Sequence, residues 1–282
     1  MDQKIEYVKE AFPSYLNRKD CIAASDIKNF LSCPKNYFYK KYEEKRAEKD
    51  RHFLFGSAWH ELVMEPEKWH EHYYISKKID LRTKDGKELY KQFKEQNEGK
   101  ECVFEEEFII MEAMAKSVRE NKTFLSLIEN AHFELSAYTV DEPSGLKIKL
   151  RPDVFCVGKS TIADLKSCLN SSAKKFKYDA LSFGYDISAA YYKHFLNRKN
   201  YLFVSCEKEA PYNTSIYQLS ENINANAMGK IRMALDLLKF CYSNNHFPDY
   251  NQFAIMKEMY FIDALPNYFE QLENNNLIFN IE

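Results

Sequence analysis

The sequence RPDVFCVGKSTIADLKS, from Arg151 to Ser167, carries the strongest structural signal in this chain. Apolar residues alternate or cluster on both sides of Gly158-Lys159, a pair typical of a tight connection, so the sequence predicts antiparallel strands over 146–157 and 160–166. Asp164 and Lys166 are two residues apart and therefore project from one face of their strand. The hairpin brings Asp153 beside them, which places two acids and a lysine together on an otherwise apolar sheet.

This constellation is typical of a site for a hard divalent cation. Charged side chains are rarely buried unless they are paired or bind metal, and Mg²⁺ prefers carboxylate oxygens. Such a cation polarises a phosphodiester and lowers the pKa of a bound water, while an ammonium group neutralises developing charge. Asp153, Asp164 and Lys166 fit these roles. Taken alone, however, so short a pattern favours an ordinary surface salt bridge.

Three further features bear on this choice. Gly56 and His60 form G-x-x-x-H on a predicted helix over 54–64, where the glycine allows close backbone approach and the histidine supplies an imidazole ligand. Glu134 lies on a predicted strand over 132–140 and is within reach of the same metal. The third feature is a shared face of the predicted helix over 185–196, suited to contact DNA and formed by Tyr185, Ser188 and Tyr192. The ordinary alternatives are a structural histidine, a solvated glutamate and core packing.

The rest of the chain predicts α/β or α+β architecture with a central mixed sheet. Pro34 divides a helical pattern over 24–42 into two short helices. Further helices are predicted at 81–97, 104–121 and 221–242, and further strands at 201–207 and 214–219. The tail after Pro248 contains few clear signals.

Composition excludes several classes of protein. The 282 residues include 40 basic and 42 acidic side chains, so a globally basic protein that coats nucleic acid is excluded, although a local basic groove is not. The seven cysteines contain no C-x-x-C pair, which argues against zinc ribbons and Fe–S clusters and favours reduced thiols in the cytoplasm. No apolar run approaches about 18 residues and no signal peptide is evident, so we expect no membrane span.

Six motifs in order resemble the PD-(D/E)XK nuclease superfamily, and more specifically the phage-type exodeoxyribonucleases related to exonuclease VIII (the RecE type). They are SDIKNFLSCPKNYFY (25–39), FGSAWHELVMEPEKW (55–69), FELS (133–136), KLRPD (149–153), IADLKS (162–167) and YDISAAYY (185–192). The sixth departs from the family, which usually has Gln where this chain has Ser188. That departure puts DNA positioning in doubt more than the chemistry.

The resemblance implies a restriction-endonuclease-like α/β core, with a central mixed sheet flanked by helices and an N-terminal helical elaboration. We expect one domain over 1–282. Its parts are a mainly helical region at 1–130 that carries the G-x-x-x-H helix, a nuclease core at 131–245 and a tail at 246–282.

The resemblance also implies roles for individual residues. Lys166 would position and activate the attacking water, and Glu134 would support the metal site. The ligands of Mg²⁺, or of Mn²⁺ in its place, would be His60, Asp153, Asp164 and the main-chain carbonyl of Leu165. Just after the metal strand, Lys174 and Lys175 are placed to contact DNA phosphates together with the helix face described above.

The family implies a metal-dependent exonuclease that degrades one strand of linear duplex DNA from a 5′ end and leaves a 3′ overhang. Its members commonly form ring-shaped oligomers and act with a single-strand annealing protein of the RecT type in phage recombination. An Fe–S cluster is not expected, because the cysteine spacing is wrong. Two alternatives stay open: an endonuclease of the same superfamily, and a catalytically silent DNA-binding protein with the same fold.

Overall fold

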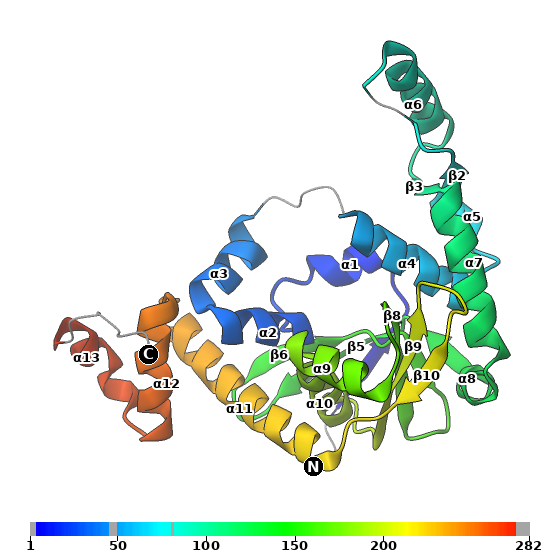
Figure 1. The fold of residues 1–282 in the computed structure, drawn as a ribbon. Coiled ribbons are helices and arrows are strands. Elements are labelled where there is room, and N and C mark those ends of the chain that lie inside the picture. Colours follow the sequence, from blue (N-terminus) through cyan, green and yellow to red (C-terminus); the bar gives the residue numbers. More distant parts are fainter. Residues whose placement is uncertain (1–3, 45–49, 80–81, 275–282) are drawn as a thin grey trace.

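A mixed five-stranded sheet forms the centre of the protein (Figure 1). The computed structural model describes residues 4–44, 50–79 and 82–274. The strand order is β10 (Thr214–Tyr217), β9 (Asn200–Glu207), β8 (Thr161–Cys168), β7 (Val154–Cys156) and β4 (Ala131–Phe133). Neighbouring strands β8 and β9 are parallel, and the other described pairs of this sheet are antiparallel. The predicted α/β class with a mixed sheet is confirmed.

Helices cover both faces of this sheet, as the alternation along β8 requires. Ile162 is buried among α2 (Ala24–Ser32), α9 (Ala173–Ser182), α10 (Tyr185–Phe195) and α11 (Glu221–Asn244). Ala163 and Leu165 are buried on the opposite face among α4 (Arg51–Met64), α7 (Glu105–Glu120) and α8 (Lys122–Ile128). Asp164 and Lys166 therefore project toward the face covered by α2 and α10.

The two long strands predicted over 132–140 and 146–157 are each broken in two, which corrects the sequence-based expectation. Their outer halves, β5 (Ser136–Asp141) and β6 (Leu146–Leu150), leave the central sheet and form a second one with β1 (Glu6–Val8), in the order β1-β5-β6. Pro152, which has no N–H to donate to a ladder, interrupts one strand. Glu134 interrupts the other with a left-handed φ of 50°. The breaks face each other, because Glu134 N donates to the Asp153 carbonyl at 3.1 Å.

The C-terminal region is helical, although its sequence contains few clear signals. It forms α12 (Tyr250–Phe261), a 3-10 turn η2 (Leu265–Asn267) and α13 (Tyr268–Asn274). Phe253, Met256 and Tyr268 are fully buried against the core that contains α2 and α11. Apolar residues occur all round α12, so it lacks the one-sided periodicity by which a surface helix is identified.

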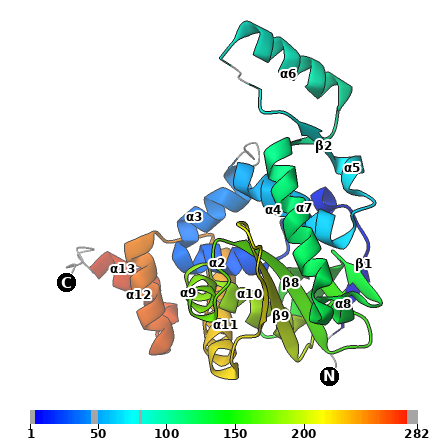
Figure 2. The same cartoon turned by 45° about the vertical axis from the view of Figure 1, so that its right-hand side comes forward.

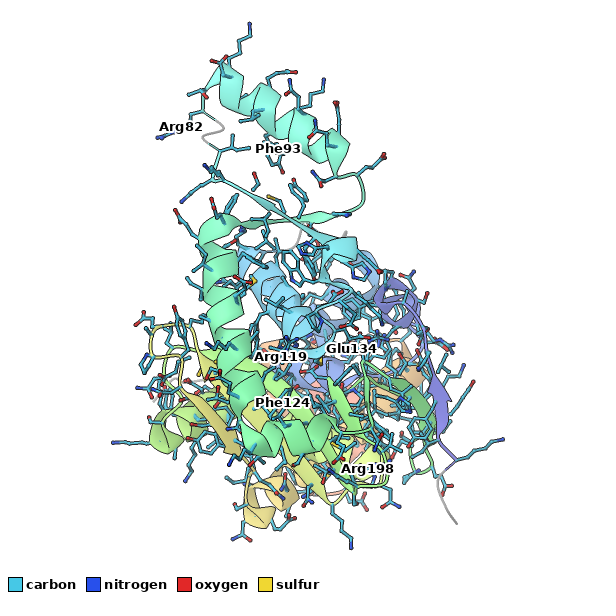
Figure 3. All side chains as sticks on the ribbon, turned by 90° about the vertical axis from the view of Figure 1, so that its right-hand side faces the viewer. Arg82, Phe93, Arg119, Phe124, Glu134 and Arg198 are labelled. Atoms are coloured by element: carbon cyan, nitrogen blue, oxygen red, sulfur yellow. The ribbon has the colours of Figure 1, made fainter. Side chains whose placement is uncertain are left out.

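An arm projects from the body (Figures 1 and 2). Parallel strands β2 (Tyr73–Ser76) and β3 (Glu101–Phe104) form its base, and α6 (Lys84–Gln96) forms its end. Figure 3 shows Arg82 and Phe93 on the arm, whereas Glu134 lies within the body. The remaining helices are α1 (Phe12–Asn17), α3 (Pro34–Phe38), the π-helix η1 (Tyr39–Glu43) and α5 (Trp69–His72). Within the described residues, no helix is both long and apolar enough to cross a membrane.

An ion pair between α11 and β5 joins the helical layer to the second sheet. Both Arg232 Nη atoms lie 2.9 Å from the carboxylate of Asp141, whose side chain is 3% exposed. We expect Arg232→Ala to lower the free energy of unfolding by about 3 kcal/mol, because it leaves a buried carboxylate unpaired. Urea denaturation measures this.

The matched control is Lys147→Ala, which removes an ion pair with Asp20 in which both side chains are mostly exposed. Exposed pairs contribute little to stability, so we expect the free energy of unfolding to stay close to the wild-type value. Equal losses in the two variants would contradict the structural role of Arg232.

Candidate metal centre

Three side chains lie close together where the two strand breaks face each other. His60 comes from α4, Glu134 from the break between β4 and β5, and Asp153 from the residue just before β7. Each offers one ligand atom, and these atoms all lie within 4.8 Å of one another. His60 Nδ1 is 3.4 Å from Asp153 Oδ2. The structure thus brings together three of the residues that the sequence predicted for the site.

Asp153 is held by the neighbouring strand. Its Oδ2 accepts a hydrogen bond from Leu165 N at 2.7 Å. Burial raises the pKa of the Asp153 carboxyl and the charge of Asp164 raises it further, although His60 acts in the opposite direction. The ionised carboxylate therefore lacks sufficient positive charge nearby, which is the condition that a bound cation would relieve.

Asp164 and Lys166 form an ion pair on β8, as expected from their shared face. Asp164 Oδ2 is buried and makes no well-aligned hydrogen bond with any described residue. Asp164 is not one of the three side chains whose ligand atoms group together, His60, Glu134 and Asp153. Burial acts to lower the pKa of Lys166, but the charges of Asp164 and Asp153 outweigh it and raise the pKa. The lysine is therefore a charged ammonium group. It lies 5.0 Å above the ring of Tyr185 and 3.4 Å from the Leu165 carbonyl oxygen.

Arg151 is a member of the site to which the sequence assigned no role. Its Nε donates to Glu134 Oε2 at 2.6 Å, and its Nη1 donates to Ser136 Oγ at 2.8 Å and to the Glu10 carbonyl at 3.1 Å. Arg151 stands in the KLRPD motif, directly before Pro152. Its position next to Pro152 was therefore the available signal, but its partners Glu134, Ser136 and Glu10 come from segments distant in the sequence.

Glu134 titrates close to neutral pH. Burial, with the negative charge of Asp153, raises its pKa to about 7 even though Arg151 opposes the shift. Below that pH Glu134 is protonated and neutral, and above it the carboxylate is free to bind a cation. A cation that binds to this carboxylate would displace the proton.

We therefore expect Mn²⁺ affinity to rise by up to about tenfold per pH unit as the pH approaches 7, and to level off above it. Calorimetric titration over a pH series measures this, and Glu134→Gln should flatten the profile. A wild-type affinity that is constant between about pH 5.5 and 8 would show that Glu134 does not exchange its proton for the metal.

The donor set fits a divalent metal ion. Carboxylate oxygens suit Mg²⁺ and Mn²⁺, and an imidazole nitrogen is a better ligand for Mn²⁺ than for Mg²⁺. Asp164, which pairs with Lys166 and whose charge acts on Asp153, is a further candidate ligand. The residues present therefore fit the predicted cofactor class, while the identity of the ion stays a prediction.

The tyrosines of α10 support the site from one side. Tyr185 lies below Lys166, and Tyr192 uses its hydroxyl to accept from Arg151 N and donate to Arg151 O, each at 3.2 Å. Ser188 is half-buried on the same helix. This face thus contacts residues of the strand break.

The lysines predicted to contact DNA lie on the surface of the helix that follows β8. Lys174 and Lys175 are exposed on α9, and Lys175 forms an ion pair with Asp179. Their contact with DNA stays a prediction.

The close backbone approach expected at Gly56 is wrong. A Cβ atom built on Gly56 would meet no heavy atom of the described residues within 4 Å. Close approach of another described segment is therefore not the reason for glycine one turn before His60.

Comparisons with known proteins identify the fold. A family model described as a PDDEXK-like domain of unknown function (DUF3799) matches residues 23–258. A candidate exonuclease from Eubacterium rectale is 16% identical, with a TM-score of 0.58 over 84% of this chain and 88% of its own. At this identity the likeness concerns the fold alone.

Two other solved structures are more distant. A phage-related exonuclease from Haemophilus somnus 129PT is 10% identical with a TM-score of 0.37, over 79% of this chain and 96% of its own. An alkaline exonuclease from Laribacter hongkongensis is 11% identical with a TM-score of 0.33, over 83% of this chain and 97% of its own. No curated protein matches the chain.

Proposed function

The chain belongs to the family of PDDEXK-like domains of unknown function DUF3799, and from this membership and the geometry of its site we propose that it is a metal-dependent nuclease that hydrolyses DNA. One observation carries the proposal. The grouped ligands His60, Glu134 and Asp153 adjoin the Asp164–Lys166 ion pair, so a cation and a catalytic ammonium group would act on one phosphate. Mg²⁺ is the proposed ion, with Mn²⁺ as a substitute.

The chain's own residues have distinct tasks in this reaction. The metal would be held by His60, Asp153, Asp164 and the Leu165 carbonyl, with Glu134 in support. When bound, the cation supplies Lewis acidity and a water of lowered pKa. Lys166 would keep its proton on Nζ, orient the attacking water and place positive charge where the phosphate becomes more negative. The Tyr185 ring restricts where that ammonium group can lie.

Arg151 has a separate task. It holds Glu134 from the side of the second sheet and so fixes the direction of the carboxylate. A side chain that hydrogen-bonds to a metal ligand in this way orients the ligand and tunes the affinity of the site for the metal.

We favour an exonuclease that acts on linear duplex DNA, proceeding from a 5′ end and leaving 3′ overhangs. The fold is shared with the Eubacterium rectale protein, itself described as a candidate exonuclease. The polarity, a ring-shaped homo-oligomer, and a RecT-like single-strand annealing partner in phage recombination rest on the motif resemblance. The proposed location is the cytoplasm, where the seven free thiols stay reduced.

Digestion of end-labelled duplexes tests this function. With Mg²⁺, the purified protein should release a 5′ label early and a 3′ label late, and should leave covalently closed circular duplex intact. Cleavage of closed circles would identify an endonuclease. Binding of duplex without digestion in either Mg²⁺ or Mn²⁺ would identify a silent DNA-binding protein.

A further inference from the structure

A second lysine lies beside the site and has no role in the reaction described above. Lys28 is half-buried on α2, and its stem packs against Gly184 at the start of α10. A Cβ built on Gly184 would lie 2.7 Å from Lys28 Cδ and 3.2 Å from Cγ. Gly184 also has a left-handed φ of 65°. The glycine thus makes room for the lysine.

The same corner of the fold positions Lys166. Tyr185 directly follows Gly184, and its ring lies 5.0 Å from Lys166 Nζ. The dipeptide Gly184-Tyr185 therefore contacts one lysine through its backbone and the other through its ring. Two cationic side chains from distant segments, α2 and β8, converge on the start of α10.

Lys28 differs from the other lysines near it in its lack of a partner. Within the part of the chain that the structure describes, its ammonium group makes no hydrogen bond or ion pair. Lys166 pairs with Asp164, and Lys41, which follows α2, pairs with Asp26 and donates to the Cys21 carbonyl at 2.9 Å. Lys28 alone among these three is left for an external anion.

The electrostatic surroundings of Lys28 also favour such an anion. Burial lowers its pKa and the like charge of Lys166 lowers it further, which Asp164 and Asp186 only partly oppose. An unpaired, partly buried cation beside another cation is unfavourable. A bound phosphate would stabilise the charged forms of both Lys28 and Lys166.

We propose that Lys28 binds a phosphate of the DNA strand that lies in the metal site. This inference rests on the proposed nuclease function, which supplies the anion. Lys28 would help to position the DNA strand by binding a phosphate next to the bond on which Lys166 acts. Its loss should therefore weaken DNA binding and raise KM more than it lowers kcat.

The test compares Lys28→Gln with wild type for binding to a labelled duplex in Ca²⁺, at several salt concentrations. Loss of one phosphate contact should lower affinity about tenfold and make the slope of log K against log salt shallower by about 0.9. Lys28→Arg should retain the slope. Lys239→Gln is the matched control, because Lys239 contacts only the Pro143 carbonyl in the β5–β6 turn, at 3.4 Å, among described residues.

Thermal unfolding checks that the variants fold. Lys28→Gln removes an unpaired charge, so we expect it to melt at or above the wild-type temperature. If the glutamine variant does not fold, Lys28→Met retains the stem that packs on Gly184 and replaces it in the assay.

The outcomes separate this inference from the proposed function. Wild-type affinity and slope in Lys28→Gln, with normal digestion by the wild type, would overturn the role of Lys28 alone. A reduced slope in a protein that never digests DNA would support the phosphate site while the nuclease proposal fails. A loss seen equally on 5′-phosphate and 5′-hydroxyl duplexes assigns Lys28 to a backbone phosphate. A loss confined to phosphorylated ends assigns it to a terminal one.

Discussion

Asp153→Asn is expected to eliminate Mn²⁺ binding at the site and to reduce DNA hydrolysis about a thousandfold, the order of effect of one essential charge-stabilising group. Asp153 is the central member of the group, since it lies 3.4 Å from His60 and accepts from Leu165 N at 2.7 Å. Asparagine keeps the shape but removes the charge that a cation needs. Calorimetric titration with Mn²⁺ and initial rates on linear duplex measure the two effects.

Asp20→Asn is the matched control for this change. Asp20 is exposed, and it forms its ion pair with Lys147 on the surface. It should retain wild-type affinity for Mn²⁺ and a wild-type rate. If Asp153→Asn binds Mn²⁺ as tightly as the wild type, Asp153 is not a ligand of the metal.

Lys166→Ala is expected to reduce hydrolysis by a similar factor, about a thousandfold, within the range for loss of a group that stabilises developing charge. Its effect on Mn²⁺ affinity should differ from that of Asp153→Asn, which eliminates binding. Removing the ammonium group frees Asp164 from its ion pair, so Mn²⁺ affinity should be equal to or higher than that of the wild type. The combination of a slow rate and retained metal separates a role in chemistry from a role in metal binding.

Lys116→Ala provides the control, because Lys116 pairs with Glu120 on the exposed surface of α7 at 3.9 Å. It should change neither measurement. A Lys166→Ala variant that loses Mn²⁺ together with activity would instead indicate that Lys166 maintains the structure of the site.

The sequence predicted which candidate side chains lie together better than it predicted their supporting contacts. Asp164 and Lys166 could be placed together because the two-residue period of a strand is a local property. The spacing on α10 likewise identified Tyr185 and Tyr192 as one face. Local periodicity does not say what such a face meets, and here it meets Lys166 and Arg151.

The strand breaks could not be predicted from periodicity, because alternation of apolar residues continues through both of them. Pro152 was a visible warning in one strand. In the other, a glutamate adopts a backbone conformation that favours glycine or asparagine, and nothing in its neighbours indicates this. The partners of Arg151 and the isolation of Lys28 depend on contacts between distant segments, so they become visible only in the folded chain.

The left-handed backbone of Glu134 sets the stability of the protein against its chemistry. A residue other than glycine in this conformation costs about 1 kcal/mol, and burial of a carboxylate near Asp153 adds to that cost. Asparagine would suit the backbone better and carry no charge. The ion pair with Arg151 only partly offsets these costs, because the pKa of Glu134 stays raised in spite of it. The strand break therefore places a carboxylate beside Asp153 at the expense of local stability.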